Sequence, residues 1–271
     1  MTAIHWREAS DLITELAAKP RFGLFSDLDG TLAPIARSPE AAHISARARQ
    51  LLAALRDEIP LLALISGRRA ESLAAKVGLP GIVYIGNHGL EQWTDGKIKV
   101  LPEAAPYLPS LQTVKKELQA LEQDGVFVED KEATLSLHYR QAKDPEQFAG
   151  LFAAQIAKIV EENGLALFTG KRVFEVRPPI EMDKGIAFRQ LAKDHHLESA
   201  LFLGDDISDL NALAMARRLR AENMYEAWGV GVQSADAPEG LADTADFLAT
   251  GVGDVEELLS LLLTARKASS T

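Results

Sequence analysis

Short, continuously apolar runs alternate with longer segments of helical periodicity in the first third of the chain. The apolar runs predict strands at 21–26 and 60–66 and a strand with its following loop at 81–89. The helical segments predict helices at 44–58 and 70–79. Strands that are apolar at every position are typical of a parallel sheet covered on both faces. This pattern predicts an α/β fold, in which ligands bind beyond the carboxyl ends of the strands.

The last third of the chain returns to this pattern, whereas the middle third departs from it. Residues 183–196 and 208–219 are predicted helices, and 200–206 is a predicted strand between them. The middle third instead gives helix–strand–strand twice, which is typical of a small antiparallel α+β unit. The sequence therefore predicts a discontinuous core domain, 1–92 and 180–271, interrupted by an inserted α+β domain, 93–179.

Apolar and polar side chains alternate along the strands predicted in the insertion. The apolar positions are Leu135, Leu137, Tyr139, Phe174 and Val176, and the polar ones are Thr134, Ser136, His138, Arg140, Glu175 and Arg177. Such alternation gives a sheet with one apolar and one polar face. The pattern alone leaves two interpretations open: the polar face meets water, or it lines a ligand cleft.

Charge and composition exclude several classes of function. The 271 residues carry a net charge of −10, which disfavours a nucleic-acid partner, and they include no cysteine, so disulfides and thiolate catalysis are impossible. No apolar run approaches the roughly 18 residues of a membrane span. The first 20 residues lack the apolar segment of a signal peptide. We therefore expect a cytoplasmic protein with no membrane partner.

Two acidic clusters each follow a predicted strand. Asp27 and Asp29 come after the first strand, and Asp205, Asp206 and Asp209 come after the strand at 200–206. The Asp-Gly pair also suits an ordinary turn, but in a parallel sheet both clusters would meet at the same edge. Several carboxylates packed together cannot all stay ionised without a cation, and all-oxygen ligands favour Mg²⁺. The sequence thus predicts a magnesium site.

A hydroxyl and an ammonium group are expected at the same edge. Ser66 ends the strand at 60–66, and Lys184 opens the helix at 183–196, where backbone N–H groups also favour an anion. A metal, a cation and a hydroxyl together suit a phosphoryl group. One carboxylate is then available as a nucleophile and another to move a proton.

Four motifs, in this order, resemble those of the haloacid dehalogenase superfamily: "DLDGT", "ISG", the lysine before Gly185, and "GDDISD". The resemblance implies a Rossmannoid parallel-sheet core in which Asp27 attacks phosphorus and Asp29 is the general acid and base. It also implies that Ser66 and Lys184 hold the phosphoryl oxygens. Mg²⁺ would be held by the carboxylates of Asp27 and Asp205 and the backbone carbonyl of Asp29, with Asp206 or Asp209 nearby.

The insertion lies where this superfamily places a C2-type cap, and its doubled helix–strand–strand pattern resembles a C2B cap. The trehalose-6-phosphate phosphatase family is similar in further motifs: "SGRR", "GNHGLE", "LHYR", "FEVRP" and "DKGIA". This resemblance implies hydrolysis of trehalose 6-phosphate, in trehalose biosynthesis, and it is compatible with a separate trehalose-6-phosphate synthase as a partner. It turns the polar cap face toward the sugar, and the implied substrate-binding residues are Arg68, His88, Glu129, Lys131, Arg140 and Glu175.

Two alternatives remain open at this stage. The chain could be another C2B-cap sugar phosphatase, acting on sucrose 6-phosphate or a mannosyl- or glucosyl-glycerate phosphate, or it could be a catalytically silent domain that binds a sugar phosphate. Every catalytic position is filled, which disfavours the silent domain. At the C-terminal end, we expect residues 264–271 to fray.

Overall fold

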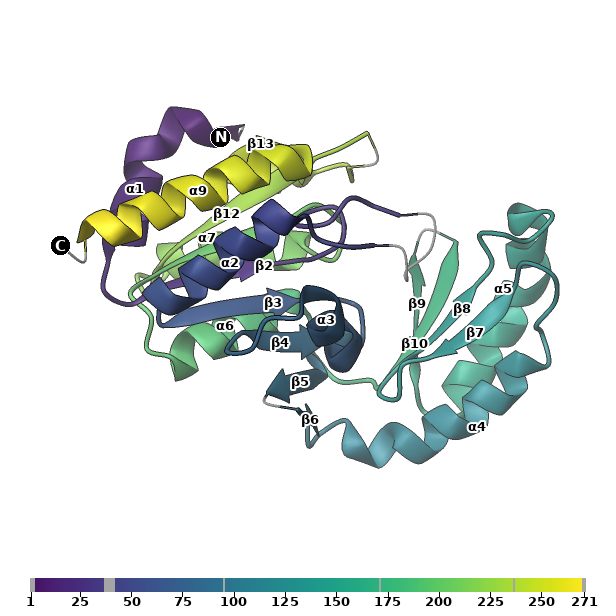
Figure 1. The fold of residues 1–271 in the computed structure, drawn as a ribbon. Helices are drawn as coiled ribbons and strands as arrows, with labels where there is room; N and C mark the ends of the chain where they lie inside the picture. Colours follow the sequence, from purple (N-terminus) through teal and green to yellow (C-terminus); the bar gives the residue numbers. More distant parts are fainter. Residues whose placement is uncertain (1–2, 37–41, 95, 171, 236, 270–271) are drawn as a thin grey trace. The chain divides into compact units, whose positions relative to one another are not determined.

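The computed structural model describes residues 3–36, 42–94, 96–170, 172–235 and 237–269. It divides into two compact units, Met1–Ile98 together with Met182–Thr271, and Lys99–Glu181 (Figure 1). We call the first the core unit and the second the insertion unit.

Among the described residues, eight strands of a nine-stranded sheet lie in the core unit, and the ninth, β6 (Lys97–Val100), crosses the division at 98/99. In spatial order its strands are β1 (Ile4–His5), β13 (Phe247–Thr250), β12 (Glu226–Gln233), β11 (Ser199–Gly204), β2 (Phe22–Ser26), β3 (Leu61–Ile65), β4 (Val83–Gly86), β5 (Glu91–Thr94) and β6 (Lys97–Val100). Neighbouring strands from β1 to β4 run parallel, and β5 pairs antiparallel with β4. β2, β3 and β11 are buried at every position, which confirms the α/β prediction.

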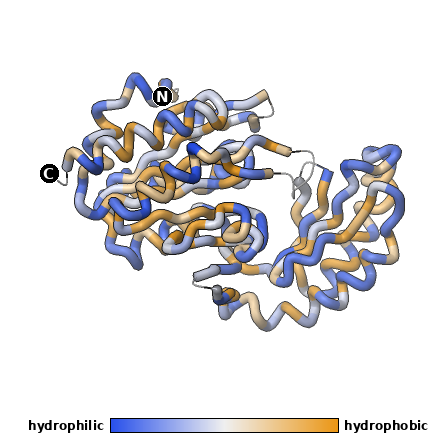
Figure 2. Tube along the Cα trace, in the orientation of Figure 1, coloured by the Kyte–Doolittle hydropathy of each residue, from blue (hydrophilic) through white to orange (hydrophobic). Residues whose placement is uncertain are grey.

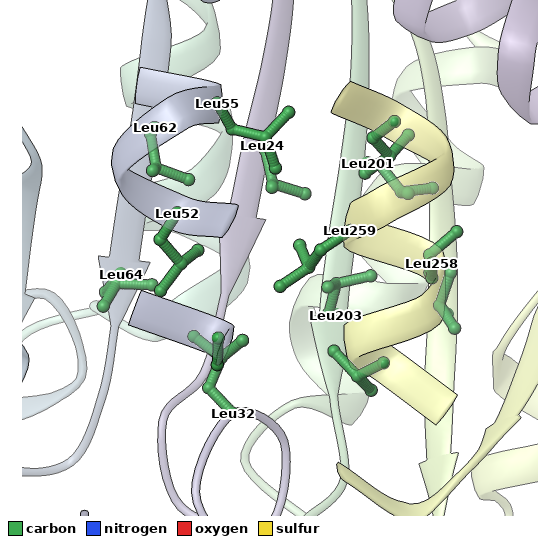
Figure 3. Close-up of a cluster of buried hydrophobic side chains, with 14 of the residues drawn as sticks. Leu24, Leu32, Leu52, Leu55, Leu62, Leu64, Leu201, Leu203, Leu258 and Leu259 are labelled. Atoms are coloured by element: carbon green, nitrogen blue, oxygen red, sulfur yellow. The ribbon is translucent and has the colours of Figure 1, made fainter. Parts of the chain in front are cut away.

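Helices cover both faces of this sheet. One face packs against α1 (Ser10–Ala18), α2 (Ala46–Glu58), α3 (Ala70–Val77) and α9 (Gly251–Ser269), and the other against α6 (Lys184–Asp194), α7 (Leu210–Ala221) and α8 (Leu241–Thr244). Successive strand residues point to opposite faces, so Leu24 joins the first layer and Phe25 the second. Leucines of the strands, α2 and α9 interlock in the first layer (Figure 3).

Polar side chains cap the N-terminal ends of α2 and α5 (Pro145–Glu162). Ser45 Oγ accepts from Ala48 N at the start of α2 (2.9 Å), and Asp144 Oδ1 accepts from Gln147 N at the start of α5 (2.9 Å). Each cap satisfies a backbone donor that the first turn of a helix leaves unpaired. The described residues also form the short 3₁₀ helices η1 (Trp6–Ala9), η3 (Asn87–Gly89) and η4 (Ala105–Tyr107).

The described residues of the insertion unit form a four-stranded antiparallel sheet with two α-helices. The strand order is β7 (Phe127–Asp130), β8 (Leu135–His138), β10 (Val173–Arg177) and β9 (Ala166–Gly170), and the helices are α4 (Leu108–Gln119) and α5 (Pro145–Glu162). The predicted apolar positions of β8 and β10 share one hydrophobic cluster with side chains of both helices. Both helices alternate hydrophobic and hydrophilic positions along their traces (Figure 2).

Three segments differ from their sequence predictions. The units divide at 98/99 and 181/182 where the sequence places 92/93 and 179/180, because Gln92 and Trp93 pair with β4 and extend the core sheet. β1 is an unpredicted strand that pairs with β13. The fraying expected at the C-terminal end is wrong as far as Ser269, because α9 continues to that residue and Arg266 is buried; residues 270–271 lie outside the described chain.

Candidate active site

Asp27 and Asp205 follow two adjacent strands of the core sheet. β2 and β11 are parallel neighbours, with Ser26 beside Leu203, so the loops after both strands begin at one edge. Asp27 N donates to Leu203 O (2.9 Å), which ties the first loop to the neighbouring strand. One carboxylate oxygen from each of Asp27, Asp205 and Asp209 lies within 4.8 Å of the other two, and all three residues are buried. The fold therefore brings the two acidic clusters together.

Gly30 allows the first loop to pass close to the second. Its φ of +86° lies in the left-handed region, and a Cβ at this position would lie 1.9 Å from Asp205 Oδ2. The Gly30 N–H donates to Ala33 O (2.7 Å), and the adjacent Thr31 Oγ1 donates to Asp205 Oδ1 (2.9 Å). The "DGT" segment thus supplies a turn and an anchor for the second aspartate.

Lys184 carries the positive charge of the site. It is the first residue of α6, whose N-cap Asp183 Oδ1 accepts from Ile186 N (2.8 Å). Its Nζ lies 2.8 Å from Asp209 Oδ1 and 3.2 Å from Asp27 Oδ1, and 1% of the side chain is exposed. Burial alone would lower the pKa of Lys184, but Asp209 and Asp27 raise it well above its ordinary value. Lys184 is therefore a fixed ammonium group.

The site holds more acidic groups than the single ammonium of Lys184 can neutralise. Burial raises the pKa of Asp205 to about 7, and the carboxylates of Asp209 and Asp206 add to the rise. Burial also raises the pKa of Asp209 to about 6 and that of Asp27 well above its ordinary value, against the attraction of Lys184. Asp27 Oδ1 is buried and accepts no hydrogen bond from the described residues. The all-oxygen group of Asp27, Asp205 and Asp209 can therefore hold a divalent cation.

Asp209 and Asp206 give the second loop its shape. Asp209 Oδ2 accepts from the backbone N–H groups of Asp205 and Asp206 (3.0 Å each), while its Oδ1 accepts from Lys184. Asp206 Oδ1 accepts from the N and Oγ of Ser208 (2.8 and 2.7 Å). Burial would raise the pKa of Asp206, but Lys184 and these hydrogen bonds lower it. Both side chains thus hold the loop that presents Asp205.

The Arg68 guanidinium donates two hydrogen bonds to the Asp29 carboxylate. Its Nε lies 2.5 Å from Asp29 Oδ2 and its Nη2 lies 2.7 Å from Asp29 Oδ1, which is the bidentate geometry that suits a guanidinium and a carboxylate. The Arg68 side chain is 14% exposed and the Asp29 side chain is 31% exposed. The sequence suggested Arg68 as a substrate contact, and here it contacts the expected general acid.

Ser66 and His88 are neighbours through the end of β3. Ser66 is buried, its backbone carbonyl accepts from His88 N (3.0 Å), and its Oγ accepts from Arg68 N (3.3 Å). The His88 ring packs on Gly67, where a Cβ would lie 2.6 Å from Nε2. "SGRR" and "GNHG" therefore form one corner of the core unit, because the glycine leaves room for the imidazole.

Three of the four predicted sugar contacts in the insertion unit gather on the polar side of its sheet. Lys131 Nζ lies 3.9 Å from Glu129 Oε2, on β7, and 3.7 Å from Glu175 Oε1, on β10. Lys131 is buried and both glutamates are partly exposed. Arg140, the fourth, is exposed two residues beyond the end of β8.

Two further polar residues join this group, although the site prediction did not include them. His138 Nε2 lies 2.8 Å from Glu129 Oε2, and Arg177 binds Glu175 through Nε (3.1 Å) and Nη2. The period-two alternation put both on the polar face. The pairings, however, depend on the register between strands, which one sequence does not reveal.

The parallel sheet, the aspartates after two adjacent strands and the buried lysine define a haloacid dehalogenase-like hydrolase core. Solved structures agree in fold. A haloacid dehalogenase-like hydrolase from Bacteroides thetaiotaomicron matches with a TM-score of 0.62 and 17% identity, covering 89% of this chain and 99% of that chain. The C. albicans trehalose-6-phosphate phosphatase C-terminal domain matches with a TM-score of 0.75 and 23% identity, covering 97% and 98%.

The chain belongs to the trehalose-phosphatase family, whose sequence model matches residues 25–239. Trehalose-phosphate phosphatase of Mycobacterium marinum is 36% identical over 202 residues, which cover 71% of this chain and 51% of that protein. Probable trehalose-phosphate phosphatase 4 of Oryza sativa subsp. japonica is 29% identical over 270 residues, covering 95% and 71%. The chain thus spans about half the length of the mycobacterial relatives it matches. Within the described residues, no helix is long and apolar enough to cross a membrane.

Proposed function

We propose that the chain hydrolyses trehalose 6-phosphate to trehalose and phosphate. The observation that carries this proposal is the buried group of Asp27, Asp205, Asp209 and Lys184 at the sheet edge of a trehalose-phosphatase family member. The family match extends through the insertion unit as well as the core unit, so it supports the substrate as well as the chemistry. A separate trehalose-6-phosphate synthase would supply the sugar phosphate.

Mg²⁺ is the proposed cofactor, held by the carboxylates of Asp27 and Asp205 and by the backbone carbonyl of Asp29. The residues fit such an ion, because Asp27 Oδ1 is buried and accepts no hydrogen bond within the described part of the chain, and because every ligand atom is oxygen. A bound Mg²⁺ would polarise the phosphoryl group and neutralise part of the negative charge around it.

The chain's own groups supply the covalent steps. An Asp27 carboxylate oxygen forms a bond to phosphorus while the bond from phosphorus to the sugar oxygen breaks, and Asp29 gives its proton to the departing alkoxide. Asp29 then takes a proton from the water that attacks the aspartyl-phosphate, which releases phosphate and restores Asp27. Lys184 and Ser66 hold phosphoryl oxygens during both steps.

The Arg68–Asp29 pair has to open before this acid can work. Both carboxylate oxygens of Asp29 accept hydrogen bonds from the guanidinium, whereas the first step needs one of them to face the departing sugar oxygen. A phosphoryl group offers the guanidinium another bidentate partner. Arg68 is therefore a proposed phosphate contact whose transfer to the substrate frees the Asp29 carboxyl group to face the leaving group.

Sugar recognition is assigned to polar side chains of both units. Glu129, Lys131, Arg140 and Glu175 in the insertion unit and His88 in the core unit are the proposed contacts. Charged groups form strong hydrogen bonds with a neutral ligand rich in hydroxyl groups, and a carboxylate can accept several at once. Other C2B-cap sugar phosphatases share the core chemistry, so these contacts decide the substrate.

The test is phosphate release from trehalose 6-phosphate, sucrose 6-phosphate and glucose 6-phosphate, with and without Mg²⁺, by the wild type and by Asp27→Asn. We expect Mg²⁺-dependent release from trehalose 6-phosphate at the highest kcat/KM, and a loss of at least about 10³-fold in Asp27→Asn. Preference for another ester would overturn the substrate. Undiminished activity in Asp27→Asn would overturn the nucleophile.

A further inference from the structure

The polar face of the insertion sheet carries an ordered row of side chains. Glu129 on β7 is opposite Ser136 on β8, Ser136 is opposite Glu175 on β10, and Glu175 is opposite Phe168 on β9. Residues directly opposite on neighbouring strands share a face. At the usual strand spacing the four positions span about 14 Å. The two carboxylates therefore lie on either side of a serine in one row.

His138 holds the first of these carboxylates. Its Nε2 lies 2.8 Å from Glu129 Oε2, and because a carboxylate only accepts hydrogen bonds, Nε2 is the donor. The imidazole stacks on Phe127, with ring centroids 4.9 Å apart and planes inclined by 24°. Phe127 is also the cross-strand partner of His138. The stack fixes the plane of the imidazole, and the hydrogen bond fixes the direction of the carboxylate.

The second carboxylate, that of Glu175, is likewise held by basic side chains. Arg177 binds Glu175 Oε2 through its Nε (3.1 Å) and its Nη2, and Lys131 Nζ lies 3.7 Å from Oε1. His138 thus orients Glu129, and Arg177 orients Glu175, each from the same face of the sheet. Such pre-orientation lowers the entropy that a ligand must offset when it binds.

Ser136 supplies an independent indication of a ligand. The residue is fully buried, and its Oγ has no hydrogen-bond partner among the described residues. A buried hydroxyl without a partner is costly, and its place in the row is between the two oriented carboxylates. A hydroxyl-rich ligand on this face would satisfy it.

We propose that His138 is a positioning residue for sugar recognition: it orients the Glu129 carboxylate to accept hydrogen bonds from sugar hydroxyls. The inference rests on the proposed function, because it takes the sugar phosphate as the ligand of this face. His138 contributes to binding of the sugar and not to transfer of the phosphoryl group. Its loss therefore affects a sugar phosphate and spares a phosphate ester without a sugar.

The experiment compares His138→Leu, His138→Gln and Phe127→Ala with the wild type on trehalose 6-phosphate and on p-nitrophenyl phosphate. We expect His138→Leu to raise KM for trehalose 6-phosphate about tenfold, the effect of one lost hydrogen bond to a charged group. Its kcat/KM for p-nitrophenyl phosphate stays within about twofold of the wild type. His138→Gln keeps an N–H donor and recovers most of the KM. Phe127→Ala raises KM in the same direction.

His195→Leu is the matched control, because His195 is an exposed histidine at the C-terminal end of α6 in the core unit. It should change neither KM, and thermal unfolding checks that each variant is folded. An unchanged KM in folded His138→Leu overturns the inference, as does an equal loss on both substrates. If His138→Leu fails to fold, a KM for trehalose 6-phosphate left unchanged by Phe127→Ala overturns it. A wild type active only on p-nitrophenyl phosphate overturns the proposed function, and the inference falls with it.

Discussion

At the scale of single residues, the candidate active site concentrates negative charge that folding alone would avoid. Asp27, Asp205 and Asp209 are buried together, and the pKa of each is raised above its ordinary value. Raised carboxyl pKa values mean that ionising these groups costs folding free energy in the absence of a cation. Function and stability therefore oppose each other at this sheet edge.

Asp205→Asn should make the metal-free protein more stable above pH 7. The pKa of Asp205 is raised from 3.8 to about 7, so its folded state keeps a proton that the unfolded chain releases. Stability is then lost as pH rises from about 4 to about 7, by roughly 4 kcal/mol at most. Asparagine removes this loss. Urea unfolding in EDTA at pH 8 and pH 4 measures the difference, which should disappear at the lower pH.

Asp206→Asn is the control for this prediction. The pKa of Asp206 is lowered, so its ionised form favours the folded state above pH 4 and its loss should not stabilise the protein.

Mg²⁺ should stabilise the wild type and not Asp205→Asn. Equal stability of the wild type and Asp205→Asn at pH 8 without metal would contradict the assignment.

At the scale of secondary-structure elements, most helices and strands follow from local patterns, and the exceptions have a common cause. Continuous apolar runs predicted β2, β3 and β11, and helical periodicity predicted α2 and α3. β1 has two residues and forms only by pairing with β13, 243 positions away at Ile4 and Phe247. Such long-range pairings leave little local signal.

Arg266→Ala should reveal how the C-terminal helix is anchored. Its buried guanidinium donates to Ala17 O (3.0 Å), Lys19 O (2.8 Å) and Glu58 O (2.8 Å), which joins α9 to the ends of α1 and α2. Removing it leaves these carbonyl groups without their donor, and we expect a loss of roughly 3 kcal/mol in unfolding free energy. Urea denaturation measures this loss.

Lys267→Ala is the matched control, because Lys267 is the exposed neighbour on the same helix turn. It should change stability by less than about 0.5 kcal/mol. A similarly small effect of Arg266→Ala would mean that α9 is held by its apolar face alone.

At the scale of the whole molecule, the insertion leaves the candidate active site within one unit. Ser66 precedes the insertion and Lys184 follows it, yet both belong to the core unit, together with both acidic clusters. The sequence was sufficient to predict this convergence, because parallel strands share one carboxyl edge. It could not predict the hydrogen bonds between Arg68 and Asp29 or between His138 and Glu129, which depend on side-chain geometry and strand register.

The most direct test of the central claim is to trap the covalent intermediate. Acyl phosphates are reduced by borohydride, so rapid mixing with trehalose 6-phosphate and Mg²⁺, then quenching into borohydride, should convert Asp27 to homoserine. Peptide mass spectrometry would detect the change at Asp27, and only when the sugar phosphate is present. Rapid turnover of trehalose 6-phosphate with Asp27 unmodified at every quench time would contradict the account.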